Sequence, residues 1–277
     1  MAERLLHVRT VQGTALRNLF ETLKDVLCDA NLIVDDSTDE PGIRILCMDN
    51  SQTALVSCRL RKDSFETFEC LQKMHLGINM QNMHKLLKSV SNLDTISFEV
   101  FRSTAATMHI TIENTEKSAK TLYKLNLLDI DQHNMTIPDT FFDSVMTMPS
   151  NDLQRICRDM NVLSDYVTFE SSGSELILTC VGDFASQSTC IGQTSNGLLI
   201  CQNQNPHSST EVEEKQMASM GTFSLKYLNL FSRATNLSGT VDIYLKNKYP
   251  LILMFSVASL GKLLFVLAPQ QQDSQDA

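Results

Sequence analysis

The sequence predicts an α+β protein of two similar modules, each combining an antiparallel sheet with two amphipathic helices. Three observations support this fold class. Apolar and polar residues alternate over much of the chain, which is typical of strands with one buried face. Four segments instead repeat apolar residues with helical period. Both kinds of segment recur in the same order in the second half of the chain, which indicates an internal repeat.

The composition is that of a folded chain. Its 277 residues are 43% hydrophobic and 20% charged, which excludes wholesale disorder. A formal net charge of −9 predicts no general affinity for nucleic acid or anionic membrane, so a DNA partner requires basic charge gathered on one face. The eight cysteines include no C-x-x-C pair, and we expect free, mostly buried thiols with no metal site. No apolar run near Met1 is long enough for a signal peptide.

Each predicted helix has a narrow apolar face, as expected for a helix that packs on a sheet. The helices are predicted over residues 13–27, 79–91, 150–163 and 224–234. In the first, Leu16 and Phe20 mark the helical spacing. Ser150 or Asn151 is expected to cap the third helix, and Ser224 the fourth.

The predicted strands have apolar residues at every second position. Ile96, Phe98 and Val100 give one example. The segment 250–269 has the length and apolarity of a membrane span, but the turn around Lys262 interrupts its middle. Two apolar runs about such a turn favour a buried hairpin, so we expect no membrane-spanning segment.

The two halves of the chain align with each other. Leu86 corresponds to Leu230, and Leu16 corresponds to Leu153. We therefore predict an N-terminal module, a connector and a C-terminal module, over residues 1–125, 126–143 and 144–277. The connector is unusually apolar for a free linker, so its side chains should rest on a surface or contact a partner.

Basic residues are concentrated on the predicted helices. Eight basic residues stand there against four acidic ones, in a chain that is otherwise strongly acidic. The basic residues are Arg17, Lys24, Lys85, Lys88, Arg155, Arg158, Lys226 and Arg233. They lie off the apolar faces, and this arrangement suits sequence-independent contact with phosphates. Because no aromatic residues are interleaved with them, recognition of single strands is disfavoured.

No catalytic motif is present. The chain lacks phosphate-binding glycine loops, a zinc-protease motif and a nucleophile elbow. We interpret Asp35–Asp36 and Glu213–Glu214 as solvated loop charges, Cys157 as a core residue and His84 as a surface residue.

Seven segments resemble the proliferating cell nuclear antigen family of eukaryotic-type DNA sliding clamps, and the resemblance covers essentially the whole chain. In order they are VQGTALRNLFETLKD, CMDNSQTALVSCRL, LGINMQNMHKLLK, LLDIDQHNMTIP, MPSNDLQRICRDM, FSLKYLNLFSRAT and LAP. The resemblance implies a clamp fold in a homotrimeric ring of six modules around duplex DNA. It implies a nuclear (or viral replication-site) processivity factor for DNA polymerase in replication and repair, which is not an enzyme and uses no cofactor.

The resemblance also implies three sets of site residues. DNA would be contacted by Arg17, Lys24, Lys85, Lys88, Arg158, Lys226 and Arg233. DNA polymerase, the clamp loader and other partners with a Gln-plus-aromatic peptide would bind Met48, Leu127, Leu128, Ile130, Met135, Ile137, Pro250, Val266, Ala268 and Pro269. Subunits would pair through residues 118–124 and 184–191, including Tyr123, Phe184 and Gln187.

The sequence departs from the family pattern at several positions. Gln52–Thr53 replaces an imidazole–valine pair, and Val266 replaces an aromatic residue, so peptide preference is expected to differ. Gly173 stands where many relatives carry a ubiquitin-accepting lysine. Two alternatives within the fold are a subunit of a heterotrimeric checkpoint clamp and a viral factor of lower oligomeric state. An alternative of another class is a metal-dependent nucleic-acid-processing enzyme using Asp35–Asp36.

Overall fold

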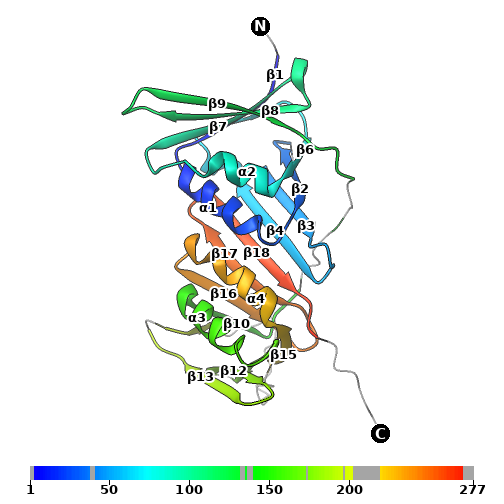
Figure 1. Ribbon diagram of the computed structural model, residues 1–277, viewed down its shortest axis with the longest axis vertical. Coiled ribbons are helices and arrows are strands. Elements are labelled where there is room, and N and C mark those ends of the chain that lie inside the picture. Colours follow the sequence, from blue (N-terminus) through cyan, green and yellow to red (C-terminus); the bar gives the residue numbers. More distant parts are fainter. Residues whose placement is uncertain are drawn as a thin grey trace, which may run out of the picture. The chain divides into compact units, whose positions relative to one another are not determined.

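The chain forms two compact units, which are described separately below (Figure 1). The computed structural model describes residues 3–37, 41–131, 135, 140–172, 174–195, 197–201 and 219–270. Unit 1 comprises Met1–Thr136 and Ser256–Leu264. Unit 2 comprises Ile137–Phe255 and Phe265–Ala277.

Unit 1 contains the first pair of helices, α1 (Gly13–Leu23) and α2 (Met80–Leu87), which pack against each other. Its strands are β1 Arg4–Thr10, β2 Asp29–Asp35, β3 Gly42–Met48, β4 Ala54–Arg61, β5 Thr67–Cys70, β6 Met74–Asn79, β7 Asp94–Phe101, β8 Thr107–Asn114 and β9 Ala119–Asn126. Two short 3-10 helices are η1 Lys62–Ser64 and η2 Arg102–Thr104. The strand orders are β5-β1-β7-β8-β9 and β4-β3-β2-β6, with antiparallel neighbours throughout.

Unit 2 repeats this plan. Its helices are α3 Ser150–Met160, α4 Leu225–Phe231 and the 3-10 helix η3 Ser232–Asn236. Its strands are β10 Ser144–Pro149, β11 Tyr166–Ser172, β12 Glu175–Val181, β13 Ser186–Gly192, β14 Leu199–Cys201, β15 Ser219–Ser224, β16 Thr240–Leu245, β17 Leu251–Val257 and β18 Gly261–Leu267. The orders β14-β10-β16-β17-β18 and β13-β12-β11-β15 match those of unit 1 element by element, which confirms the repeat.

The four helices lie where the apolar periodicity predicts them, but each ends earlier than predicted. The N-terminal caps also differ. Pro149 occupies the cap position of α3, and the Ser150 hydroxyl instead donates to the Ser238 carbonyl at 2.6 Å. Ser224 stands at the cap position of α4 without a side-chain capping bond. The predicted cap was therefore wrong for α3, whereas for α4 the predicted cap position is confirmed without a side-chain bond.

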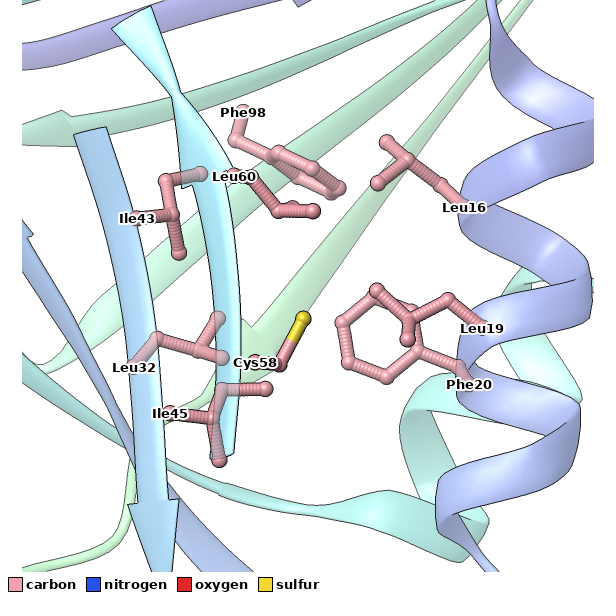
Figure 2. A pocket seen from close by; sticks show the side chains of 9 residues that line it. All are labelled: Leu16, Leu19, Phe20, Leu32, Ile43, Ile45, Cys58, Leu60 and Phe98. Carbon is pink, nitrogen blue, oxygen red and sulfur yellow. The ribbon is translucent and has the colours of Figure 1, made fainter. Parts of the chain in front are cut away.

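Part of the core of unit 1 lies between α1 and strands of both of its sheets (Figure 2). Leu16, Leu19 and Phe20 of α1 face Leu32, Ile43, Ile45, Cys58, Leu60 and Phe98 of the strands. They enclose an apolar cavity of about 10 Å³, which is at the lower size limit for one water molecule and offers it no polar partners. In unit 2, Phe231 of α4 stacks on Phe265 with 4.4 Å between ring centroids.

The apolar segment 250–269 forms the predicted hairpin, as β17 and β18. Its tip, Ser256–Leu264, belongs to unit 1. There Leu260 accepts a backbone hydrogen bond from Arg61 at 2.9 Å, and a Cβ on Gly261 would lie 1.9 Å from the Arg59 carbonyl oxygen. The tip therefore packs closely along β4. Within the described residues no helix is both long and apolar enough to cross a bilayer.

Candidate nucleic-acid interface and protein-docking surfaces

The basic residues predicted to contact DNA lie on the helices or in the turns that follow them. Five of the seven side chains are exposed, because the opposite face of each helix is buried against its sheet. The exposed five are Lys85, Lys88, Arg158, Lys226 and Arg233. Among the described residues, all of these except Arg233 are outside any ion pair, so their ammonium and guanidinium groups are available to an anionic ligand.

Arg17 and Lys24 differ from the other five, because the structure uses them within unit 1. The Arg17 guanidinium donates to the Val90 carbonyl at 2.7 Å and to the Asn18 side chain at 3.3 Å. Lys24 forms an ion pair with Asp25 at 3.5 Å, and only 19% of its side chain is exposed. A DNA phosphate would have to compete with these partners for Arg17 and Lys24. The sequence alone does not reveal this competition.

His84 on α2 is half-buried: part of the residue is exposed, as predicted, but its Nδ1 atom is buried. Among the described residues its Nδ1 atom has no hydrogen-bond partner. Burial and the nearby Lys24 lower the pKa of His84, while Glu21 and Asp25 act in the opposite direction. His84 is therefore neutral at pH 7 and adds no charge to the helices.

The start of the connector is hydrogen-bonded to unit 1. The amide of Leu127 donates to Ala106 at 2.9 Å, and the amide of Leu128 donates to the carbonyl of Gly77 at 2.8 Å. Gly77 lies on β6, at the free edge of its sheet, so Leu128 forms an isolated antiparallel bridge there. The start of the connector thus rests on unit 1, as its composition predicts.

The residues of the predicted peptide groove fall on both units. In unit 1, Met48 is 36% exposed and Leu128 is 43% exposed. Leu127, Ile130 and Met135 are half-buried. Ile137 lies outside the described residues.

In unit 2, Pro250, Val266 and Pro269 are half-buried and Ala268 is exposed. The C-terminal segment repeats the docking of the connector, because the amide of Gln270 donates to Thr222 of β15 at 2.9 Å. β15 is the counterpart of β6 in the repeat.

Three aromatic residues near Pro250 were missed by the sequence analysis. Phe141 is 82% exposed and Tyr249 is 41% exposed. Lys246 links them, because its ammonium donates to the Phe141 carbonyl at 3.0 Å and lies 4.8 Å from the centre of the Tyr249 ring. Phe142 packs edge-on against a neighbouring tyrosine. The sequence did contain a signal for this aromatic surface, namely the two adjacent phenylalanines in FFD and the tyrosine that precedes Pro250.

The residues predicted at subunit contacts lie at or beside open sheet edges. Tyr123 is on β9, which ends the order β5-β1-β7-β8-β9 among the described strands. Gln187 is on β13, which ends the order β13-β12-β11-β15, and Phe184 just before it is 77% exposed.

Asp35 is buried at the end of β2, at 2% exposure, so its interpretation as a solvated loop charge was wrong. Hydrogen bonds from Ser37, at 2.7 and 2.9 Å, lower the pKa of Asp35 against the effect of burial. Asp36 forms an ion pair with Lys62 at 2.5 Å. Both carboxylates therefore have structural partners. Glu213 and Glu214 lie outside the described residues.

Cys157 is buried on α3, as predicted, and burial raises the pKa of its thiol to about 12. Such a thiol is not a nucleophile at pH 7. No group of His, Cys, Asp or Glu within the described ranges could hold a metal ion.

Comparisons with known proteins agree along the whole chain. Residues 5–135 match the model for the N-terminal domain of proliferating cell nuclear antigen, and residues 136–270 match the model for its C-terminal domain. The chain is 40% identical over 269 residues to the probable DNA polymerase sliding clamp 1 of Paramecium bursaria Chlorella virus 1, covering 96% of this chain and 97% of that protein. It is 33% identical over 271 residues to the proliferating cell nuclear antigen of Chaetomium thermophilum, covering 98% and 100%. The crystal structure of the Entamoeba histolytica protein of that name superposes with a TM-score of 0.83 at 26% identity, covering 98% and 100%.

Proposed function

Because the chain belongs to the proliferating cell nuclear antigen family of DNA sliding clamps, we propose that three copies of it close into a ring around duplex DNA. Sliding clamps bind DNA and DNA polymerase, and the members of this family are non-enzymatic scaffold proteins. The chain acts in DNA replication as a processivity factor for DNA polymerase. Its modules are residues 1–125 and 144–277, joined by the connector 126–143, and it works in the nucleus or at a viral replication site.

The ring is supported above all by two open edges on one chain. β9 and β13 each end a described sheet and are exposed along most of their length. Exposed edge strands pair readily with strands from another chain. Because the two edges differ, β9 of one copy would pair with β13 of the next, and such head-to-tail contacts form a ring when the rotation between copies closes.

Light scattering at micromolar concentration should give three times the chain mass of 31.1 kDa. Phe184→Asp should lower this mass toward that of one chain, because a charge would replace apolar surface worth about 1.5–3 kcal/mol at each contact. Phe141→Asp is the matched control, since Phe141 is similarly exposed but belongs to neither β9 nor β13. A stable monomer or dimer of the wild type would contradict the homotrimer and favour a heteromeric or lower-order clamp.

Within the ring, the helices would face the DNA and hold it without reading its sequence. Lys85, Lys88, Arg158 and Lys226 are exposed and outside ion pairs within the described residues, as phosphate contacts require. Since a closed ring holds DNA topologically, weak contacts are sufficient and sliding stays easy. The remainder of the chain is strongly acidic and would repel DNA from other surfaces.

Partners would dock on the connector through a peptide that carries a Gln and aromatic residues. Leu128 supports this assignment, because its backbone is fixed to Gly77 while 43% of the residue stays exposed. Phe141 and Tyr249 add aromatic surface beside Pro250, so peptide preference should differ from that of clamps with an aromatic residue at position 266.

Leu128→Ala should weaken binding of such a peptide about tenfold to a hundredfold, because the lost apolar contact is worth about 1–3 kcal/mol. Calorimetric titration with a peptide bearing two adjacent aromatic residues measures the change. Leu71→Ala is the matched control, because Leu71 is 64% exposed but outside the groove. If Leu128→Ala binds the peptide as tightly as wild type, the connector is not the docking site.

A further inference from the structure

We propose that Asn31 is a positioning residue for partner binding, which holds the connector on the sheet through Ile130; this inference rests on the proposed docking groove. Asn31 lies on β2, and its side-chain Nδ2 donates to the Ile130 carbonyl at 3.2 Å. Ile130 is one of the residues proposed to contact the peptide. Asn31 therefore acts through the connector backbone rather than by touching the partner.

Gly77 makes this contact sterically feasible. In the β2–β6 register, Gly77 stands directly opposite Asn31. A Cβ at Gly77 would lie 2.2 Å from the Leu128 carbonyl oxygen and 3.1 Å from Cδ1 of Ile130. The space that a side chain would fill is thus occupied by the connector, which brings the Ile130 carbonyl within reach of the Asn31 amide.

The connector is therefore tied to the sheet on both sides of Asp129. The Leu128 amide is bonded to the Gly77 carbonyl at 2.8 Å, and the Ile130 carbonyl is bonded to Asn31. Leu128 remains exposed although its backbone is held by these hydrogen bonds. Binding to a surface that is already ordered avoids the entropic cost of ordering it, so the Asn31 bond should increase affinity for the peptide.

The test uses Asn31→Asp, which keeps the shape of the side chain but replaces its N–H donor with an acceptor. Peptide binding is measured by calorimetry, and order in the connector by amide hydrogen exchange at Leu128. We expect affinity to fall about two- to tenfold, the usual effect of one neutral hydrogen bond, and exchange at Leu128 to become faster. Asn31→Ala should behave alike, and Asn31→Gln, which retains an amide donor, should recover part of the affinity.

Asn82→Asp is the charge-matched control, because Asn82 is exposed on α2, and it should leave both readings unchanged. Equal melting temperatures for wild type and the Asn31 variants would show that changes in peptide affinity and exchange do not come from general destabilisation. If Asn31→Asp and Asn31→Ala accelerate exchange at Leu128 but bind the peptide like wild type, the positioning role is wrong and the groove stands. The role is also wrong if exchange is unchanged. If wild type binds no such peptide, the groove itself is wrong, and the inference is overturned with it.

Discussion

Replacing Lys85, Lys88 and Lys226 together with alanine should lower affinity for duplex DNA at least several hundredfold at about 0.1 M salt. The plot of log affinity against log salt should also become shallower by about 2.7 for each subunit of the ring whose lysines contact the DNA, since each lost phosphate contact removes about 0.9 from the slope. These three lysines are exposed, and within the described ranges they take part in no ion pair. Their loss should therefore leave folding and assembly intact.

The control replaces Lys73, Lys248 and Lys262 with alanine. These lysines are also exposed but lie outside the helices, so the net charge changes equally without loss of the proposed contacts. Titration of a fluorescent duplex at several salt concentrations compares the two triple variants. Equal slopes for both would mean that the helices do not face DNA.

Phe20→Ala should lower the free energy of unfolding by about 3–5 kcal/mol, the largest effect on stability expected from a single substitution here. Phe20 is 3% exposed and faces the sheet across an interior that already contains a small apolar cavity (Figure 2). Truncation would enlarge that cavity and remove the contacts that the ring makes with the buried faces of the strands. Because Arg17 lies on α1 and Lys24 directly follows it, loosening the helix should disturb the DNA-facing surface as well.

Urea denaturation at fixed protein concentration measures this change, since the stability of an assembled chain depends on concentration. Phe141→Ala is the control: at 82% exposure its ring should contribute less than about 0.5 kcal/mol. A loss below about 1 kcal/mol for Phe20→Ala would contradict the packing described for α1.

The sequence predicted the architecture well because local periodicity decides which face of an element is buried. Leu16 and Phe20 identified α1 without knowledge of the sheet beneath it, and the alternating runs of 250–269 identified the hairpin. The order of elements then repeated, so the second module followed from the first. Helix ends and caps were less predictable, because Ser150 found a carbonyl partner at Ser238 that is distant in the sequence.

Residue type and family resemblance predicted which residues belong to the site, but not the contacts that those residues make. The sequence placed Arg17 and Lys24 with the other basic residues, but it could not indicate that Val90 and Asp25 compete for them. Asp35 was misjudged because its neighbours are polar, whereas its burial depends on the sheet and on Ser37. Residues that β pairing brings into contact from distant parts of the chain leave no local pattern in the sequence.

The hairpin tip has a consequence for biosynthesis. Ser256–Leu264 completes unit 1 against β4, yet it is translated after Ile137–Phe255. At about 5–20 residues per second, the ribosome needs roughly 6–24 seconds to synthesise that intervening segment. Throughout this interval the nascent N-terminal unit lacks the partner of Arg61 and exposes the edge of β4. Unit 1 can therefore complete its fold only after the C-terminal hairpin has been synthesised. Premature termination before Leu264 would leave both units incomplete.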